Sequence, residues 1–104
     1  MTRFAVIVQP DAEAEIEAAF TYLATAASVE RAVDWFNRLE AALSTLEGMP
    51  RRCPPAPENV FFEDEIRQLL LPPYRILFTI RKRSVHMLHV RHMARDKLEG
   101  FEGR

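Results

Sequence analysis

The stretch that decides the fold is "EIRQLLLPPYRILFTIRKRSVHMLHVRH", residues 65–92. It holds three apolar runs separated by turn residues: 65–71, 74–80 and 85–90. Such runs, rich in β-branched and aromatic residues, predict three successive antiparallel strands. Pro72 and Pro73 must lie in a turn, because proline cannot donate a hydrogen bond to a neighbouring strand.

Two helices are predicted upstream of these strands. Residues 3–8, "RFAVIV", predict a first strand that Pro10 closes. Apolar residues then recur at intervals of three and four over residues 11–27 and again over 29–46, which is the period of an amphipathic helix. Ser28 is a suitable N-cap for the second helix, and a connection this short predicts a helical hairpin.

A link with four prolines, residues 49–64, joins the second helix to the strands. The predicted order is therefore β-α-α-β-β-β, which belongs to the α+β class. We expect the helical hairpin to pack on one face of a small antiparallel sheet, within a single domain spanning residues 1–104.

Composition narrows the class of protein. No apolar run is long enough for a membrane span, no signal peptide is visible and the lone Cys53 excludes an internal disulfide, so we expect a cytoplasmic protein without a membrane partner. His86, His89 and His92 would alternate between the two faces of a strand, so they could not bind one metal ion together. The three glycines form no phosphate-binding loop. We therefore expect no metal and no cofactor.

Charge is unevenly distributed, although the formal net charge is -1. Residues 1–50 carry a net charge of -5, and residues 51–97 carry +5. The two halves can present faces of opposite sign, and a basic face can bind phosphate or an acidic partner. The near-zero total argues against a protein that binds nucleic acid by overall charge.

Strand alternation predicts which residues face away from the helices. Tyr74, Ile76, Phe78 and Ile80 form the apolar set of their strand, which leaves Arg75 on the opposite, open face. The last strand admits two registers. In the favoured register Leu88 and Val90 join the core while His89 and Arg91 point outward beside Arg75; in the other, His86, Leu88 and His92 point outward. The first places fewer polar groups in the core.

The favoured register creates a candidate basic face that could bind a target. Its members are Arg67, Arg75, His89, Arg91 and Arg95. Such a face could hold the phosphates of RNA or the carboxylates of a partner protein. The alternative is a solvated face whose arginines pair with Glu63, Asp64 and Glu65, and composition alone favours it.

Several phrases together resemble the RelE/ParE superfamily of toxins from bacterial type II toxin–antitoxin modules. They are "PDAEAEIEAAFTYLA", "AVDWFNRLEAALSTLEGMP", "PRRCP", "IRQLLLPPYRILFTI" and "MLHVRHMAR", and the resemblance covers residues 3–95. It implies a compact α+β toxin that a cognate antitoxin neutralises. It also implies contact with DNA only indirectly, through the antitoxin.

The resemblance leaves two targets open. RelE-like toxins cut messenger RNA on the ribosome, and the candidate catalytic residues here would be Arg75, Arg91 and His92. ParE-like toxins inhibit DNA gyrase and are not nucleases. No tyrosine follows Tyr74, and the link carries Arg51 and Arg52 rather than lysines. These departures favour a ParE-like gyrase inhibitor; the alternative is a RelE-like ribosome-dependent endoribonuclease, so enzymatic activity stays undecided.

Overall fold

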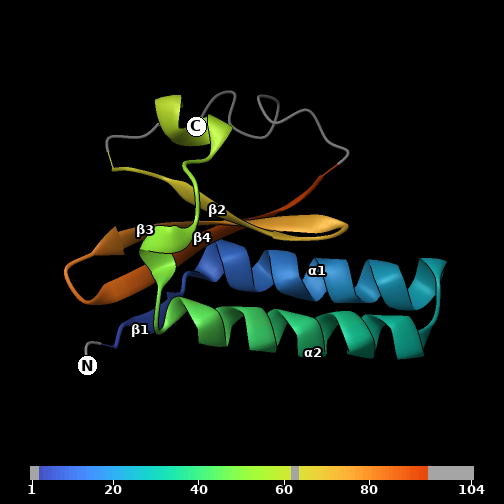
Figure 1. Ribbon diagram of the computed structural model, residues 1–104. Coiled ribbons are helices and arrows are strands. Elements are labelled where there is room, and N and C mark those ends of the chain that lie inside the picture. Colours follow the sequence, from blue (N-terminus) through green and yellow to red (C-terminus); the bar gives the residue numbers. More distant parts are fainter. Residues whose placement is uncertain (1–2, 62–63, 94–104) are drawn as a thin grey trace.

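The computed structural model describes residues 3–61 and 64–93 (Figure 1). The predicted α+β order is confirmed, and two short 3₁₀ helices interrupt the proline-rich link. The elements, in chain order, are β1 (Ala5–Val8), α1 (Pro10–Ala26), α2 (Val29–Leu46), η1 (Pro50–Arg52), η2 (Pro57–Phe61), β2 (Arg67–Leu71), β3 (Tyr74–Arg81) and β4 (Ser84–His92). No helix in this part of the chain is long and apolar enough to cross a membrane.

The sheet has four strands in the order β1-β4-β3-β2. β2, β3 and β4 pair antiparallel, as their short turns predict, but β1 runs parallel to β4. The sheet is therefore mixed rather than wholly antiparallel. Turn length dictates the direction of neighbouring strands, whereas the direction of β1 depends on how the whole helical hairpin folds back.

The main core lies between the helical hairpin and one face of the sheet (Figure 1). Ala12 and Ala19 of α1 are buried, and their small side chains let the helix approach β4 closely. The Trp35 ring of α2 packs against Tyr74 of β3, with ring centroids 5.2 Å apart. Ser28 caps α2, since its Oγ accepts a hydrogen bond from the Arg31 N–H at 3.1 Å.

An irregularity between Leu77 and Phe78 shifts the pairing of β3 with β4 by one residue. Met87 pairs with Phe78, whereas His89 pairs with Leu77, so Leu88 is the extra residue of a bulge. The prediction that Val90 lies in the helix-facing core is confirmed. The prediction that Leu88 joins it is wrong, because the bulge turns Leu88 toward Leu77 on the other face.

The second face of the sheet is covered by the link, not open to solvent. Figure 1 shows the link passing over the sheet on the side away from the helices. The Ala56 N–H donates to the Ile66 carbonyl at 2.8 Å, and the Gln68 N–H donates to the Pro54 carbonyl at 2.9 Å. Ala56, Ile66 and Leu77 form a small buried cluster there. The expectation of an open basic face is therefore wrong over this part of the sheet.

Candidate functional site

Arg75 is buried beneath the link rather than exposed on an open face. Only 7% of the residue is accessible, and Glu58 of η2 is fully buried. The Arg75 guanidinium donates to both carboxylate oxygens of Glu58, with Nη1 2.8 Å from Oε1 and Nη2 bonded to Oε2. Nη1 also donates to Gln68 Oε1 at 3.1 Å. Arg75 is thus the centre of a buried polar cluster that ties the link to the sheet.

The surroundings of Glu58 keep its carboxylate charged. Burial alone would raise the pKa of Glu58, but the hydrogen bonds from Arg75 and from the backbone, with the charges of Arg75 and Arg91, lower that pKa below its usual value. The ion pair is therefore intact at neutral pH. A buried pair with satisfied hydrogen bonds contributes little net stability, but it is costly to break from one side.

Arg67 is likewise committed to the link. Its Nη1 donates to the carbonyl oxygens of Cys53 at 2.5 Å and Arg51 at 3.1 Å, and its Nη2 bonds Glu65 at 3.1 Å. Arg81 pairs with Asp64 at 2.6 Å. Two of the acidic partners anticipated for a solvated basic face therefore do pair with arginines. Arg67 nevertheless acts mainly through the backbone carbonyls that it bridges.

Arg91 lies beside Arg75, as the favoured register predicts. The two residues pair directly across β3 and β4, and Arg91 is half-buried. Its charge contributes to the low pKa of Glu58. The strand pairing therefore brings a second guanidinium next to the buried Arg75–Glu58 pair.

His89 and His92 each contact a residue outside that polar cluster. His89 pairs with Leu77 across β3 and β4, and its Nδ1 is 3.2 Å from Glu15 Oε2 of α1, a contact that the sequence did not predict. His92 packs edge-on against Tyr74, with ring centroids 5.1 Å apart, on the side of the sheet that faces the helices. Arg95 lies outside the described residues.

Arg75 and His92, two of the candidate nuclease residues, lie on opposite faces of the sheet, whereas Arg91 pairs with Arg75 and lines a cavity with His92. RNA cleavage needs a base, an acid and cationic groups around one phosphate. Arg75 is held by Glu58 beneath the link, while His92 contacts Tyr74 on the opposite face. Among the described residues, no group of three or more His, Cys, Asp or Glu side chains is arranged to hold a metal ion.

A cavity of about 500 Å³ opens between α1 and the end of β4. Its polar lining includes Glu15, Tyr22, Arg91 and His92. Glu15 also accepts the Val90 N–H at 2.8 Å, beyond the point where β1 stops pairing with β4, so its carboxylate occupies a donor at this edge of β4.

Sequence reasoning missed Glu15 and Glu58, the two carboxylates that organise these regions. Glu15 is one of several acidic residues of α1, and its signal is its position one helical turn from the buried Ala12 and Ala19. Glu58 is one of three acidic residues in the proline-rich link, together with Glu63 and Asp64. A carboxylate in such a link is compatible with many pairings, and only the fold selects Arg75.

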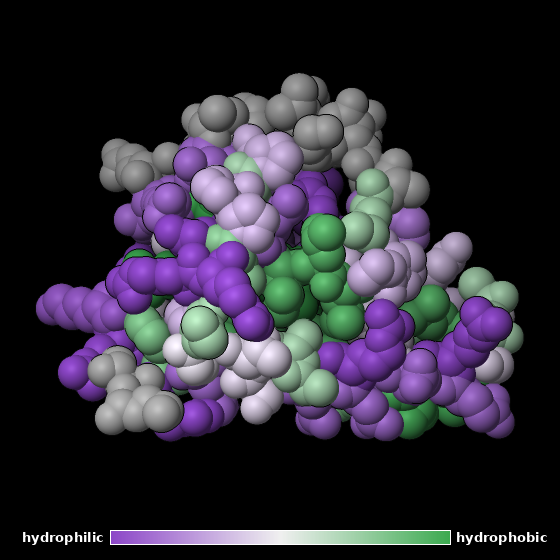
Figure 2. Space-filling view, in the orientation of Figure 1, coloured by the Kyte–Doolittle hydropathy of each residue, from purple (hydrophilic) through white to green (hydrophobic). Residues whose placement is uncertain are grey.

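Apolar side chains also remain exposed on the outer side of the hairpin and at the β2 edge. Phe20 and Phe36 contact each other edge-on at 6.4 Å and line a shallow groove with Ile16. Val29, Val33 and Leu70 are each more than two-fifths exposed. Figure 2 shows hydrophobic surface in the middle of the viewed side, between more hydrophilic regions. Adjoining exposed apolar groups, as in the groove formed by Phe20 and Phe36, are typical of a protein-binding surface.

Comparison with known proteins agrees with this architecture. A family model described as the ParE toxin of the type II toxin–antitoxin system parDE matches residues 6–97. No curated protein matches the chain. A solved structure titled "Chromosomal ParDE TA system from P. aeruginosa" shares the fold, with a TM-score of 0.72 and 14% identity, over 86% of this chain and 96% of that chain. The chain therefore belongs to the family of ParE toxins of type II toxin–antitoxin systems.

Proposed function

We propose that this protein inhibits DNA gyrase and is not a ribosome-dependent nuclease. One observation carries the choice: Arg75, the best candidate for a phosphate-binding cation, is neutralised by Glu58 and buried at 7% exposure. His92, the candidate acid or base, contacts Tyr74 on the other face. Inhibition by binding needs no such constellation, and membership of the ParE family supports it.

The partner that neutralises the toxin is a cognate antitoxin. Exposed apolar residues on α2 and Leu70 of β2, which is 54% exposed, offer it a surface. An amphipathic helix could bury the hairpin side chains, and an extended segment could add to a strand edge. DNA would then be reached through the antitoxin, and the toxin would act in the cytoplasm.

Two parallel assays on the purified full-length chain test this proposal. The first follows supercoiling of relaxed plasmid by gyrase, and the second follows cleavage of messenger RNA on ribosomes. We expect loss of supercoiling with intact messages, and recovery of supercoiling when equimolar antitoxin is added. Cleaved messages with normal supercoiling would establish the RelE-like alternative instead. If neither assay responds, gyrase is not the target.

A variant pair sharpens the nuclease test. Arg91→Gln and His92→Gln remove the two candidate nuclease groups outside the buried ion pair. We expect both variants to keep gyrase inhibition without acquiring or losing RNA cleavage. If either variant abolished a ribosome-dependent cleavage that the native chain performs, the proposed function would be wrong.

A further inference from the structure

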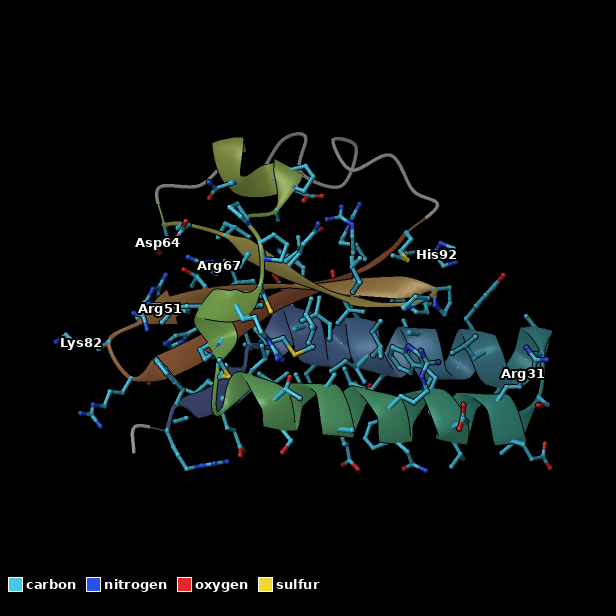
Figure 3. The ribbon with its side chains drawn as sticks, in the orientation of Figure 1. Arg31, Arg51, Asp64, Arg67, Lys82 and His92 are labelled. Atoms are coloured by element: carbon cyan, nitrogen blue, oxygen red, sulfur yellow. The ribbon has the colours of Figure 1, made fainter. Side chains whose placement is uncertain are left out.

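One end of the molecule carries a dense group of exposed cations that the basic-face hypothesis did not include. We call it the basic tip, and its residues are Arg51, Arg52, Arg81, Lys82 and Arg83. All five are exposed. Figure 3 shows Arg51 and Lys82 at the same end of the molecule, with Lys82 directed away from the body, and Arg31 at the opposite end.

A backbone hydrogen bond and a side-chain contact also bring these residues together. The Ala5 N–H donates to the Arg83 carbonyl at 2.9 Å, which places the β3–β4 turn beside the start of β1. Phe4 comes directly before Ala5 in the chain. The Arg51 guanidinium lies over the Phe4 ring, 5.5 Å from the ring centroid. The start of β1 therefore joins η1 to the turn, and the two elements present their cations on one surface.

The basic tip is only partly neutralised. Arg81 is paired with Asp64 at 2.6 Å. Within the described ranges 3–61 and 64–93, no ion pair is found for Arg51, Arg52, Lys82 or Arg83. Four cations at one end of a chain with a formal net charge of -1 create a strong local potential.

The basic tip is formed at one end of the sheet. There β4 pairs with both β3 and β1, since Ser84 faces Arg81 on one side and Ala5 on the other. Lys82 has a φ of 55°, the left-handed conformation of a tight hairpin turn. Duplex DNA carries about one negative charge per 1.7 Å of its axis, so its backbone offers a dense row of anions to cations gathered at one end of a molecule.

The chemistry of the basic tip favours nucleic acid over a protein. Residues 81–84, "RKRS", contain no apolar side chain. Protein interfaces keep an apolar or aromatic centre from which charged residues are depleted, whereas interfaces with DNA are more polar and much more positive. Guanidinium groups also match phosphate oxygens with two parallel hydrogen bonds.

We propose that the basic tip binds the phosphate backbone of duplex DNA directly and without sequence selectivity. The acidic residues Glu30 and Asp34 lie around Arg31 on the helices, so repulsion from DNA would orient the molecule with the basic tip toward the duplex. This inference goes beyond the proposed function, because it gives the toxin its own contact with DNA.

Binding of the purified full-length chain to a labelled duplex of about 20 base pairs, followed by fluorescence anisotropy at several salt concentrations, tests the proposal. The test variant is Lys82→Asn/Arg83→Gln, since asparagine tolerates the left-handed conformation. The matched control is Arg31→Gln/Arg38→Gln, which removes the same charge from the helices. We expect the test variant to lose about tenfold or more in affinity and to flatten the salt dependence by about 1–2 in logarithmic slope, with the control within about twofold.

A second variant distinguishes the loss of charge from a local folding defect in the β3–β4 turn. Arg51→Gln/Arg52→Gln removes two cations of the basic tip from a different element, and it should weaken binding by a similar factor while thermal unfolding stays native-like. The proposal is overturned if the native chain does not bind at low salt, or if the control loses as much affinity as the test variants. It is also overturned if polyglutamate competes as well as duplex DNA per unit charge, which would indicate an acidic protein partner.

Discussion

The carboxylate of Glu58 and the guanidinium of Arg75 form a bidentate ion pair beneath the link, with Glu58 fully buried. Glu58 belongs to η2 and Arg75 to β3, so the pair fastens an irregular segment to a central strand. The basic residue that sequence reasoning placed on the working surface of the sheet is instead part of what closes that surface.

Removal of one partner of this pair should strongly destabilise the fold. In Glu58→Ala the buried guanidinium loses its counter-charge, and we expect the free energy of unfolding to fall by about 3–5 kcal/mol in urea denaturation. The double variant Glu58→Leu/Arg75→Met should recover a large part of that loss. As a control, Asp64→Asn breaks the half-exposed pair with Arg81 and should cost at most about 1 kcal/mol. Equal losses in Glu58→Ala and Asp64→Asn would contradict a special role for the buried pair.

The same ion pair should make stability depend on acid pH. The pKa of Glu58 is lowered on folding, so its contribution is fully present above the ordinary value of 4.5 and is lost as pH falls through the folded pKa. The free energy of unfolding of the native chain should therefore exceed that of Glu58→Gln near neutral pH, and the gap should narrow below about pH 4.5. A gap of constant size down to strongly acidic pH would show that the Glu58 charge does not contribute.

Cys53 should react slowly in the folded protein. Burial raises the pKa of its thiol, although the charges of Arg52 and Arg67 oppose that rise in part, and the side chain is covered. We expect alkylation by iodoacetamide at mildly alkaline pH to be much slower for the native chain than for the chain in urea. Similar rates in both conditions would mean that the link opens readily from the sheet.

Glu15 should contribute to stability through the edge of β4. Its carboxylate accepts the Val90 N–H at 2.8 Å and contacts the His89 ring, so Glu15→Ala leaves a backbone donor without its acceptor. We expect a loss of about 1–3 kcal/mol in the free energy of unfolding. Glu17→Ala, an exposed change on the same helix, is the control and should alter it by less than about 0.5 kcal/mol. If the two variants lose the same amount, the contact with β4 carries no stability.

Local patterns in the sequence were sufficient for the elements and for most of their order. Turn residues separate the last three strands, and the three-and-four spacing of apolar residues marks both helices, because each signal depends on neighbours in the chain. That Arg91 lies beside Arg75 also followed, once the register with fewer polar groups in the core had been chosen. The β4 bulge could not be predicted, since an extra residue at Leu88 changes the phase without any local signature.

The sequence by itself determined an α+β chain with a helical hairpin, an antiparallel meander and a basic second half. Tertiary structure alone decided that β1 lies parallel to β4, that the link returns over the sheet, and that Glu58 meets Arg75. The physical reason is the same in each case. Each of these contacts joins segments that are far apart in the sequence and that meet only when the whole molecule packs. The buried charge of Glu58 finds its partner only once folding has removed water from both side chains.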